Sequence, residues 1–192
     1  MREYIKIGIN VLWGILMLYW AVSSLDSKAT AQQEAGWKRL LYYWLPIFVS
    51  MYLLGPGEWF GHTWLRESFV PHTDFVSIVA FLLALLGLIT ACWARYLLGR
   101  NWSLSVQKKQ DHELIRSGPY KWVRHPIYTG LLLLFTGTAL LVGDYRGILA
   151  VVIMVVAFWL KLRKEEQVMA ELFGEQYEAY RQQTKALIPF VW

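Results

Sequence analysis

Two short polar stretches of this chain carry the residue types that could do chemistry. The first is "SGPYKWVRHPIYTG" (117–130), in which Arg124 and His125 precede a proline. The second is "KLRKEEQ" (161–167), which ends a run of apolar residues. Together they offer cationic groups, carboxylates and aromatic rings beside lipid. This combination suits a zwitterionic small molecule that meets an amphiphile.

The first stretch predicts the start of a helix. Pro126 favours the first helical turn, because its missing N–H is not needed there. The helix N-terminus then presents backbone N–H groups and a partial positive charge to a carboxylate or another anion. Tyr128 falls in the first turn, and the turn signal "SGPY" folds Tyr120 back toward it.

The second stretch has two interpretations. Glu165 and Glu166 could be only the first solvated residues beyond an apolar helix, with Glu165 pairing with Lys161 one turn back. A functional role requires a ligand that carries a positive charge. Other polar residues near the apolar runs have an equally plain explanation as interfacial anchors, namely Trp102, Trp122, Lys108, Lys109 and Arg116.

The remaining residues predict a membrane protein that holds these stretches in place. The chain has 192 residues, of which 56% are hydrophobic and 17% charged, with a mean hydropathy of +0.33. A helix needs about 20 residues to cross a hydrocarbon core of about 30 Å. We therefore predict an all-α integral membrane protein with five transmembrane helices, of which the last two form a hairpin around "GDYRG". The apolar segments run over 5–25, 40–54, 75–98, 127–142 and 147–162.

The basic residues predict the orientation. Most Lys and Arg residues fall in the loop 26–39, the long loop 99–126 and the C-terminal tail. By the positive-inside rule, the N-terminus lies outside, and the long loop and the tail share the cytosolic face. The net charge of +5 then points to anionic headgroups of the lipid bilayer and not to nucleic acid. The tail from 164 to 183 predicts an amphipathic helix with a break at Gly174.

The two stretches also resemble a known family. "HELIRSGPYKWVRHPIYTG" (112–130) and "EEQVMAELFGEQYEAYRQQTKALIPF" (165–190) resemble the isoprenylcysteine carboxyl methyltransferases and, more distantly, the phospholipid N-methyltransferases. The resemblance implies a single domain, 1–192, with N-terminal helices in 1–98 and a catalytic half in 99–192. It also implies S-adenosylmethionine as cofactor, with S-adenosylhomocysteine as product. The cofactor pocket would be cytosolic, formed by the 99–126 loop and the C-terminal helix.

The resemblance assigns roles to individual residues. Glu165 falls where the family's acidic residue meets the cofactor's ammonium group. The family has an arginine four residues earlier that holds the acceptor carboxylate, whereas this chain has Lys161 there and Arg163 two residues on. Lysine offers a point charge but no planar fork. The other cofactor-contacting positions are Gln107, His112, Glu113, Leu114, Ile115, Tyr120, Arg124, His125, Pro126, Ile127 and Tyr128.

The sequence does not decide which chemical group accepts the methyl group. A carboxylate, such as that of a prenylated cysteine entering from the bilayer, is already ionised and needs only a cation, Lys161 or Arg163, to position it. A phospholipid amine must instead lose a proton, for which Glu166 or His125 is the candidate base. Fatty, polyketide and small hydrophobic acids are further options.

Two other classes of protein compete with a methyltransferase. One is an NADPH-dependent membrane reductase, although the chain has no GxGxxG motif. The other is a non-enzymatic membrane protein, in which charges near the middle of the bilayer would be expected. The oligomeric state does not follow from the sequence. His62 and His72 have no further ligands close by in sequence, so no metal site is predicted.

Overall fold

The described part of the chain is built from helices. The computed structural model describes residues 1–25, 37, 40–99 and 114–188. In this part the structure has helices, turns and two isolated β-bridges, which confirms the all-α class there. The elements are α1 (Arg2–Ser24), the π-helical turn η1 (Leu40–Trp44), α3 (Leu45–Leu54), the 3₁₀ turns η2 (Gly57–Phe60) and η3 (Trp64–Arg66), α4 (Asp74–Leu98), the 3₁₀ turn η5 (Gly118–Lys121), α5 (Pro126–Val142), α6 (Tyr145–Phe173) and α7 (Glu175–Gln183).

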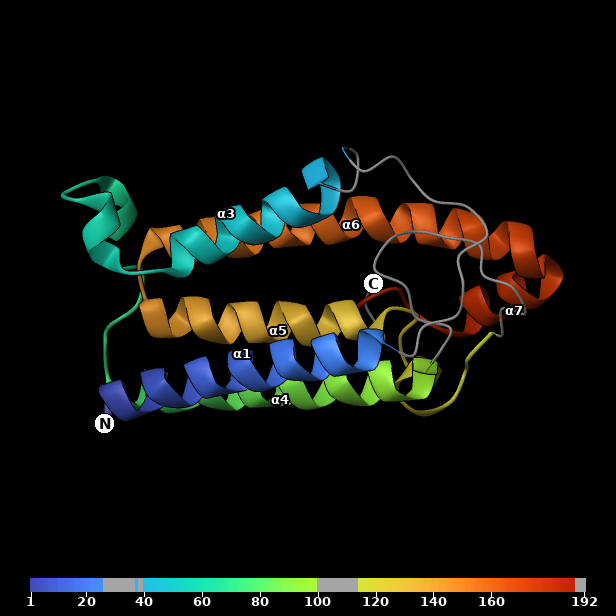
Figure 1. Cartoon of the computed structure of the whole chain (residues 1–192), viewed down its shortest axis with the longest axis horizontal. Coiled ribbons are helices and arrows are strands. Elements are labelled where there is room, and N and C mark those ends of the chain that lie inside the picture. Colours follow the sequence, from blue (N-terminus) through green and yellow to red (C-terminus); the bar gives the residue numbers. More distant parts are fainter. Residues whose placement is uncertain (26–36, 38–39, 100–113, 189–192) are drawn as a thin grey trace.

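Helices α1, α3, α4, α5 and α6 run side by side along the long axis of the molecule (Figure 1). The most extensive packing is between α4 and α5, and α5 also packs against α6. α1 lies on α4, and α3 lies on α6. The C-terminal end of α4, the N-terminal end of α5 and the C-terminal part of α6 with α7 lie at one end, opposite the N-terminus (Figure 1). The two polar stretches of the sequence therefore meet at a single end of the bundle.

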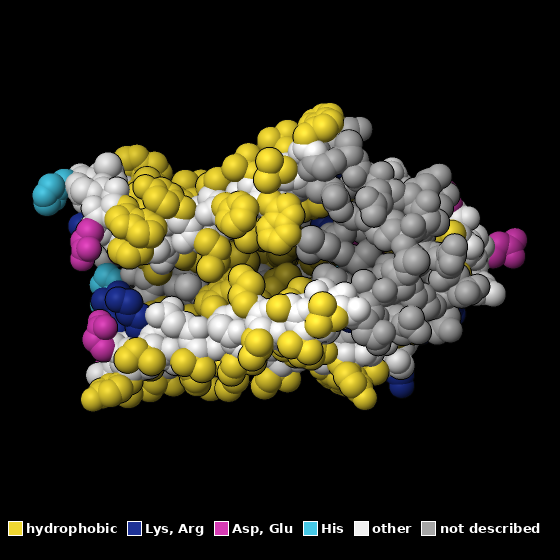
Figure 2. All heavy atoms as spheres, in the orientation of Figure 1, with side chains coloured by type: hydrophobic (Ala, Val, Ile, Leu, Met, Phe, Trp, Pro, Cys, Tyr) yellow, Lys and Arg dark blue, Asp and Glu magenta, His cyan; other side chains and the backbone are white. Residues whose placement is uncertain are grey.

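Three of the helices are long and apolar enough to cross a membrane by length and composition, namely α1, α4 and α6. The stretch 40–54 and α5 are apolar but shorter. Hydrophobic side chains cover the flanks of the bundle, and charged side chains are visible at its ends (Figure 2). This distribution is that of a helical membrane protein.

Helix α6 extends beyond the predicted apolar segment. The sequence predicted an apolar segment over 147–162 and an amphipathic helix over 164–183, and α6 continues from the apolar part without interruption to Phe173. The segment "KLRKEEQVMAELF" consists mainly of strong helix formers and contains no glycine or proline, so nothing ends the helix there. The predicted break at Gly174 is confirmed, because this glycine has a φ of +49° and separates α6 from α7. The charged end of α6 is consequently held rigidly by its apolar part.

Small residues bring α4 and α5 into close contact. A Cβ atom at Gly87 would lie 2.5 Å from both the Gly130 carbonyl oxygen and the Leu134 amide nitrogen, which are backbone atoms of α5. A Cβ at Gly130 would in turn lie 2.6 Å from the Ala91 amide nitrogen. Glycine at these positions lets the helix backbones approach, as is common between membrane helices. This packing fixes the N-terminal end of α5, where the first polar stretch lies.

We expect Gly87→Ala to destabilise the bundle, because the new methyl group must push α5 away from α4. The cost should be about 1–3 kcal/mol, measured as a fall in the midpoint of thermal unfolding in detergent. The matched control is Gly14→Ala in α1, where a Cβ would meet no atom within 4 Å. That change should be neutral or stabilising by up to about 1 kcal/mol, since alanine favours a helix over glycine. Equal midpoints for the two variants would contradict the close approach of α4 and α5.

The opposite end of the bundle is tied together by Arg146, at the start of α6. Its Nε atom donates to Asp144 Oδ2 at 3.0 Å, and its Nη1 atom donates to the Leu53 carbonyl oxygen at 2.9 Å. His72 Nε2 lies 3.1 Å from the Val142 carbonyl oxygen. The hairpin turn is thus joined to the end of α3 and to the residues before α4, which fixes α6 lengthwise against its neighbours.

Candidate active site

The backbone of the first polar stretch is held by the C-terminal segment. His125 precedes α5 as its N-cap residue, and its N–H donates to the Ala186 carbonyl oxygen at 3.0 Å. The Thr129 hydroxyl donates to the Leu187 carbonyl oxygen at 2.7 Å. The segment 184–188 therefore runs along the turn before α5. These contacts orient the His125 side chain toward α6.

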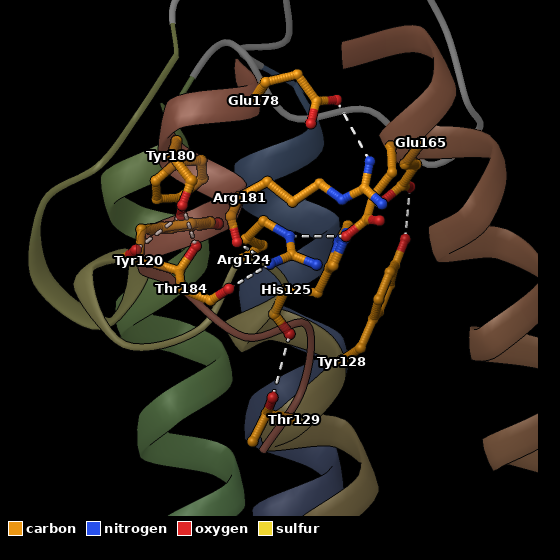
Figure 3. A network of polar contacts seen from close by, with 11 residues as sticks. Tyr120, Arg124, His125, Tyr128, Thr129, Glu165, Glu178, Tyr180, Arg181 and Thr184 are labelled. Carbon is orange, nitrogen blue, oxygen red and sulfur yellow. Dashed lines mark hydrogen bonds and ion pairs between the residues drawn. The ribbon is translucent and has the colours of Figure 1, made fainter. Parts of the chain in front are cut away.

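Two carboxylates of α6 meet this turn in a network of hydrogen bonds (Figure 3). The Tyr128 hydroxyl donates to Glu165 Oε1, and His125 Nδ1 lies 3.5 Å from Glu165 Oε2. Arg124 Nε donates to Glu166 Oε1 at 2.7 Å, and His125 Nε2 lies 3.3 Å from the same oxygen. His125 therefore bridges the two glutamates. We call these five residues the acidic cluster.

Aromatic rings and an ammonium group border the acidic cluster. The Tyr128 ring stacks on the His125 ring, with centroids 5.6 Å apart, and on the Phe158 ring, with centroids 4.8 Å apart. Lys161 Nζ lies 5.4 Å from the centroid of the Tyr128 ring and 4.9 Å from that of Tyr43. Lys161 therefore lies beside Tyr128, whose hydroxyl holds Glu165. The site places a cation, two carboxylates and stacked rings together at the end of an apolar bundle.

Burial and the glutamates act on the pKa of His125 in opposite directions. Burial by itself lowers the pKa, but the hydrogen bonds and charges of Glu165 and Glu166 outweigh it, so the pKa is raised above its usual value of 6.5. The protonated ring donates from both nitrogens, which matches one carboxylate on each side. His125 is thus suited to hold the two carboxylates in place.

The raised pKa of His125 predicts a pH dependence of stability. A group with a raised folded-state pKa contributes stability that is complete below its unfolded-state pKa, here about 6.5, and that is lost as the pH rises through the folded-state pKa. The unfolding midpoint of the wild type should therefore exceed that of His125→Gln most at pH 6, and the difference should shrink toward pH 9. A difference that is constant or that grows with pH would contradict the bridge. The same series in a Glu166→Gln background should show a weaker dependence.

The structure brings together most, but not all, of the predicted site residues. Arg163 lies elsewhere, since it is exposed and its Cζ atom is 4.1 Å from the centroid of the Trp159 ring. The Tyr120 hydroxyl donates to the Ala94 carbonyl oxygen of α4 at 3.3 Å, so its described polar contact is with the bundle. Residues in or beside the acidic cluster are Arg124, His125, Tyr128, Lys161, Glu165 and Glu166; Pro126 and Ile127 are buried at the start of α5, and Ile115 packs on the core. Gln107, His112 and Glu113 lie outside the described residues.

An open hollow of about 640 Å³ lies farther along α6, around its junction with α7. Its lining consists of Leu114, Arg116, Phe173, Glu175, Gln176 and Ala179. Of the predicted cofactor-contacting positions in the described chain, only Leu114 borders it. No residue of the acidic cluster lines this hollow, so the case for a site rests on the cluster itself.

Two features of the site were missed in the sequence analysis. One is the course of 184–188 along the turn before α5; the short apolar run "ALI" was its only signal. The other is Tyr43, a buried residue of η1 whose ring faces Lys161. Nothing in the aromatic run "LLYYW" distinguishes this tyrosine from its neighbours. The position of Tyr43 beside Lys161 depends on the packing of the N-terminal half of the chain against α6.

The fold and the cluster define a helical membrane protein with a charged site at one end of its bundle. A family model described as phospholipid methyltransferase matches residues 75–176, which is more than half of the chain. The protein-S-isoprenylcysteine O-methyltransferase of Schizosaccharomyces pombe is 31% identical over 161 residues, covering 78% of this chain and 67% of the relative. That of Saccharomyces cerevisiae is 31% identical over 125 residues, covering 62% of this chain and 51% of the relative.

A solved structure is also similar. It is that of a eukaryotic intramembrane Ras methyltransferase, an isoprenylcysteine carboxyl methyltransferase, with a TM-score of 0.56 and 25% identity over 78% of this chain and 52% of that chain. The chain therefore belongs to the phospholipid methyltransferase family, together with the protein-S-isoprenylcysteine O-methyltransferases. It spans between about half and two thirds of the length of these curated relatives.

Proposed function

We propose that this protein is an S-adenosylmethionine-dependent methyltransferase that methylates the carboxylate of an isoprenylcysteine-type or similar hydrophobic acceptor at the membrane surface. One observation carries the proposal: Tyr128 contacts the Glu165 carboxylate through its hydroxyl and the Lys161 ammonium through its ring, at the end of an apolar bundle. A site of this kind can hold a cationic group on one side and an anionic group on the other.

The residues present fit the cofactor. Glu165 accepts a hydrogen bond from Tyr128 and lies near His125, and a carboxylate has further lone pairs to accept from an ammonium group. The rings of Tyr128 and Phe158, which stack on each other, are of the type whose faces attract a positively charged ligand. When bound, S-adenosylmethionine supplies an electrophilic sulfonium methyl group. The part of this chain is to orient both reactants and to limit the access of water.

The electrostatics of the acidic cluster favour a carboxylate acceptor. An ionised carboxylate needs no base, and Lys161 provides the positive charge that would align it. An amine acceptor would need a base that is able to take a proton near pH 7. Glu166 is paired with Arg124 at 2.7 Å, and His125 has a raised pKa because of the two glutamates. Both candidate bases are therefore occupied in holding the cluster together.

The position of the cluster suits an acceptor that enters from the bilayer. We place five transmembrane helices in the membrane, α1, the stretch 40–54, α4, α5 and the apolar part of α6, with the cluster and the C-terminus on the cytosolic side and the N-terminus outside. The basic residues of the tail support this orientation. A recess bordered by hydrophobic side chains runs between α3 and α1 in the view of Figure 2. Such a recess could accommodate an apolar chain.

A methyl-transfer assay tests the proposal. Protein in lipid vesicles would be given cofactor with a labelled methyl group and, separately, an N-acylated farnesylcysteine, a fatty acid and a phosphatidylethanolamine. We expect label on the farnesylcysteine that base treatment releases, because methyl esters are labile to base. Label that resists base and stays on the phospholipid would replace this proposal with N-methylation. The description of the matching family model as phospholipid methyltransferase makes this the second candidate.

A further inference from the structure

The N-terminal half of the chain contributes one ring to the site. Tyr43 lies in η1, it is only 7% exposed, and the centroid of its ring is 4.9 Å from Lys161 Nζ. On α5, the Tyr128 ring centroid lies 5.4 Å from the same nitrogen. The Lys161 ammonium is therefore within cation–π distance of two rings that come from opposite halves of the chain.

These contacts restrict a side chain that is otherwise flexible. Lysine has a four-carbon stem with several rotatable bonds and lacks the planar fork by which arginine grips a carboxylate. Two ring faces near its ammonium reduce the number of positions that it samples. The rings interact with the charge without neutralising it.

The local backbone agrees with a functional role for Tyr43. η1 is a π-helical turn directly before α3, and short π-helical turns occur frequently at functional sites. The next residue back, Tyr42, faces another cation, since Lys164 Nζ lies 4.7 Å from the centroid of its ring. Tyr42 is 44% exposed and does not adjoin the acidic cluster by any described contact. The two neighbouring tyrosines thus make the same kind of contact, one at the site and one outside it.

We propose that Tyr43 is a positioning residue that, together with Tyr128, holds the Lys161 ammonium in place for the carboxylate of the acceptor. The inference rests on the proposed function and extends it by naming a residue that determines specificity for an anionic acceptor. Tyr43 acts on the Lys161 ammonium through the face of its ring.

The test changes the electron density on the face of the ring at residue 43 and keeps the shape of the ring. Tyr43 would be replaced by phenylalanine and by phenylalanines with one to three ring fluorines, which withdraw electrons from the ring face and weaken cation–π attraction. The Kd of N-acylated farnesylcysteine and its KM in methyl transfer would be measured, together with the Kd of S-adenosylmethionine. With Tyr43→Phe as the reference, we expect the acceptor Kd and KM to rise stepwise to about tenfold with fluorination. The kcat and the cofactor Kd should stay nearly constant.

Tyr42→Leu and Tyr43→Leu provide the matched pair. Tyr43→Leu should raise the acceptor KM about tenfold, whereas Tyr42→Leu should leave it unchanged. Acceptor constants that do not respond to fluorination, or a wild type that binds no carboxylate acceptor, would overturn the role of Tyr43. A third outcome is that the wild type transfers no methyl group, while the Kd of the carboxylate acceptor still rises with fluorination at residue 43. This outcome would support the inference and reject the proposed reaction. The two failures are therefore distinguishable.

Discussion

Glu165→Gln should weaken the binding of S-adenosylmethionine by about 30- to 1,000-fold. The substitution keeps the shape of the side chain but removes the negative charge that would face the cofactor's ammonium group. Loss of one partner of a buried, hydrogen-bonded charge pair costs about 2–4 kcal/mol. Titration calorimetry on purified protein in detergent gives the Kd directly. This is the largest effect expected of any single substitution in the acidic cluster.

Two variants separate this effect from damage to the fold. Tyr128→Phe removes only the hydroxyl that donates to Glu165, so it should weaken cofactor binding by about tenfold or less. Glu178→Gln removes an exposed carboxylate of α7 that lies 3.3 Å from Arg181, and it should leave the Kd unchanged. If Glu165→Gln binds the cofactor as tightly as the wild type does, the assignment of Glu165 is wrong.

Lys161→Met should raise the KM of a carboxylate acceptor by about 10- to 100-fold. Methionine keeps an unbranched side chain of similar length but cannot attract the carboxylate, and a charge-assisted hydrogen bond contributes about 1.5–3 kcal/mol. Cofactor affinity should change by less than about threefold, because Glu165 and its partners Tyr128 and His125 remain. Initial rates at varied acceptor and saturating cofactor separate the two constants.

Arg163→Met is the control for Lys161→Met. The sequence left both cations as candidates for holding the acceptor, whereas the structure places the exposed Arg163 on the Trp159 ring. Arg163→Met should therefore leave the acceptor KM within about twofold of the wild type. If the effects were reversed, with a high KM in Arg163→Met and a normal one in Lys161→Met, the acceptor would approach along a different face of α6. Lys161→Arg should retain most of the activity, since the charge is kept.

The sequence was sufficient for much of the candidate site. The proline after His125 predicted where α5 begins, because its ring suits the first helical turn and few other places. The charges that end an apolar run predicted that Glu165 and Glu166 lie where α6 leaves the bundle. Both signals are local, which is why they can be read without tertiary information. The sequence did not show that α6 continues to Phe173, since a change from apolar to polar residues does not mark the end of a helix.

The sequence by itself therefore determined the class of the protein and the chemical groups at its site. Apolar runs require helices in a membrane, because unpaired backbone groups are costly there, and the motifs carry the cations, carboxylates and rings. The tertiary structure decided which groups meet. The packing of α5 and α6 joins His125 to both glutamates, and the rotation of α6 selects Lys161 over Arg163. The packing of η1 against α6 adds Tyr43. Such choices depend on side-chain directions between elements distant in sequence, which no local pattern records.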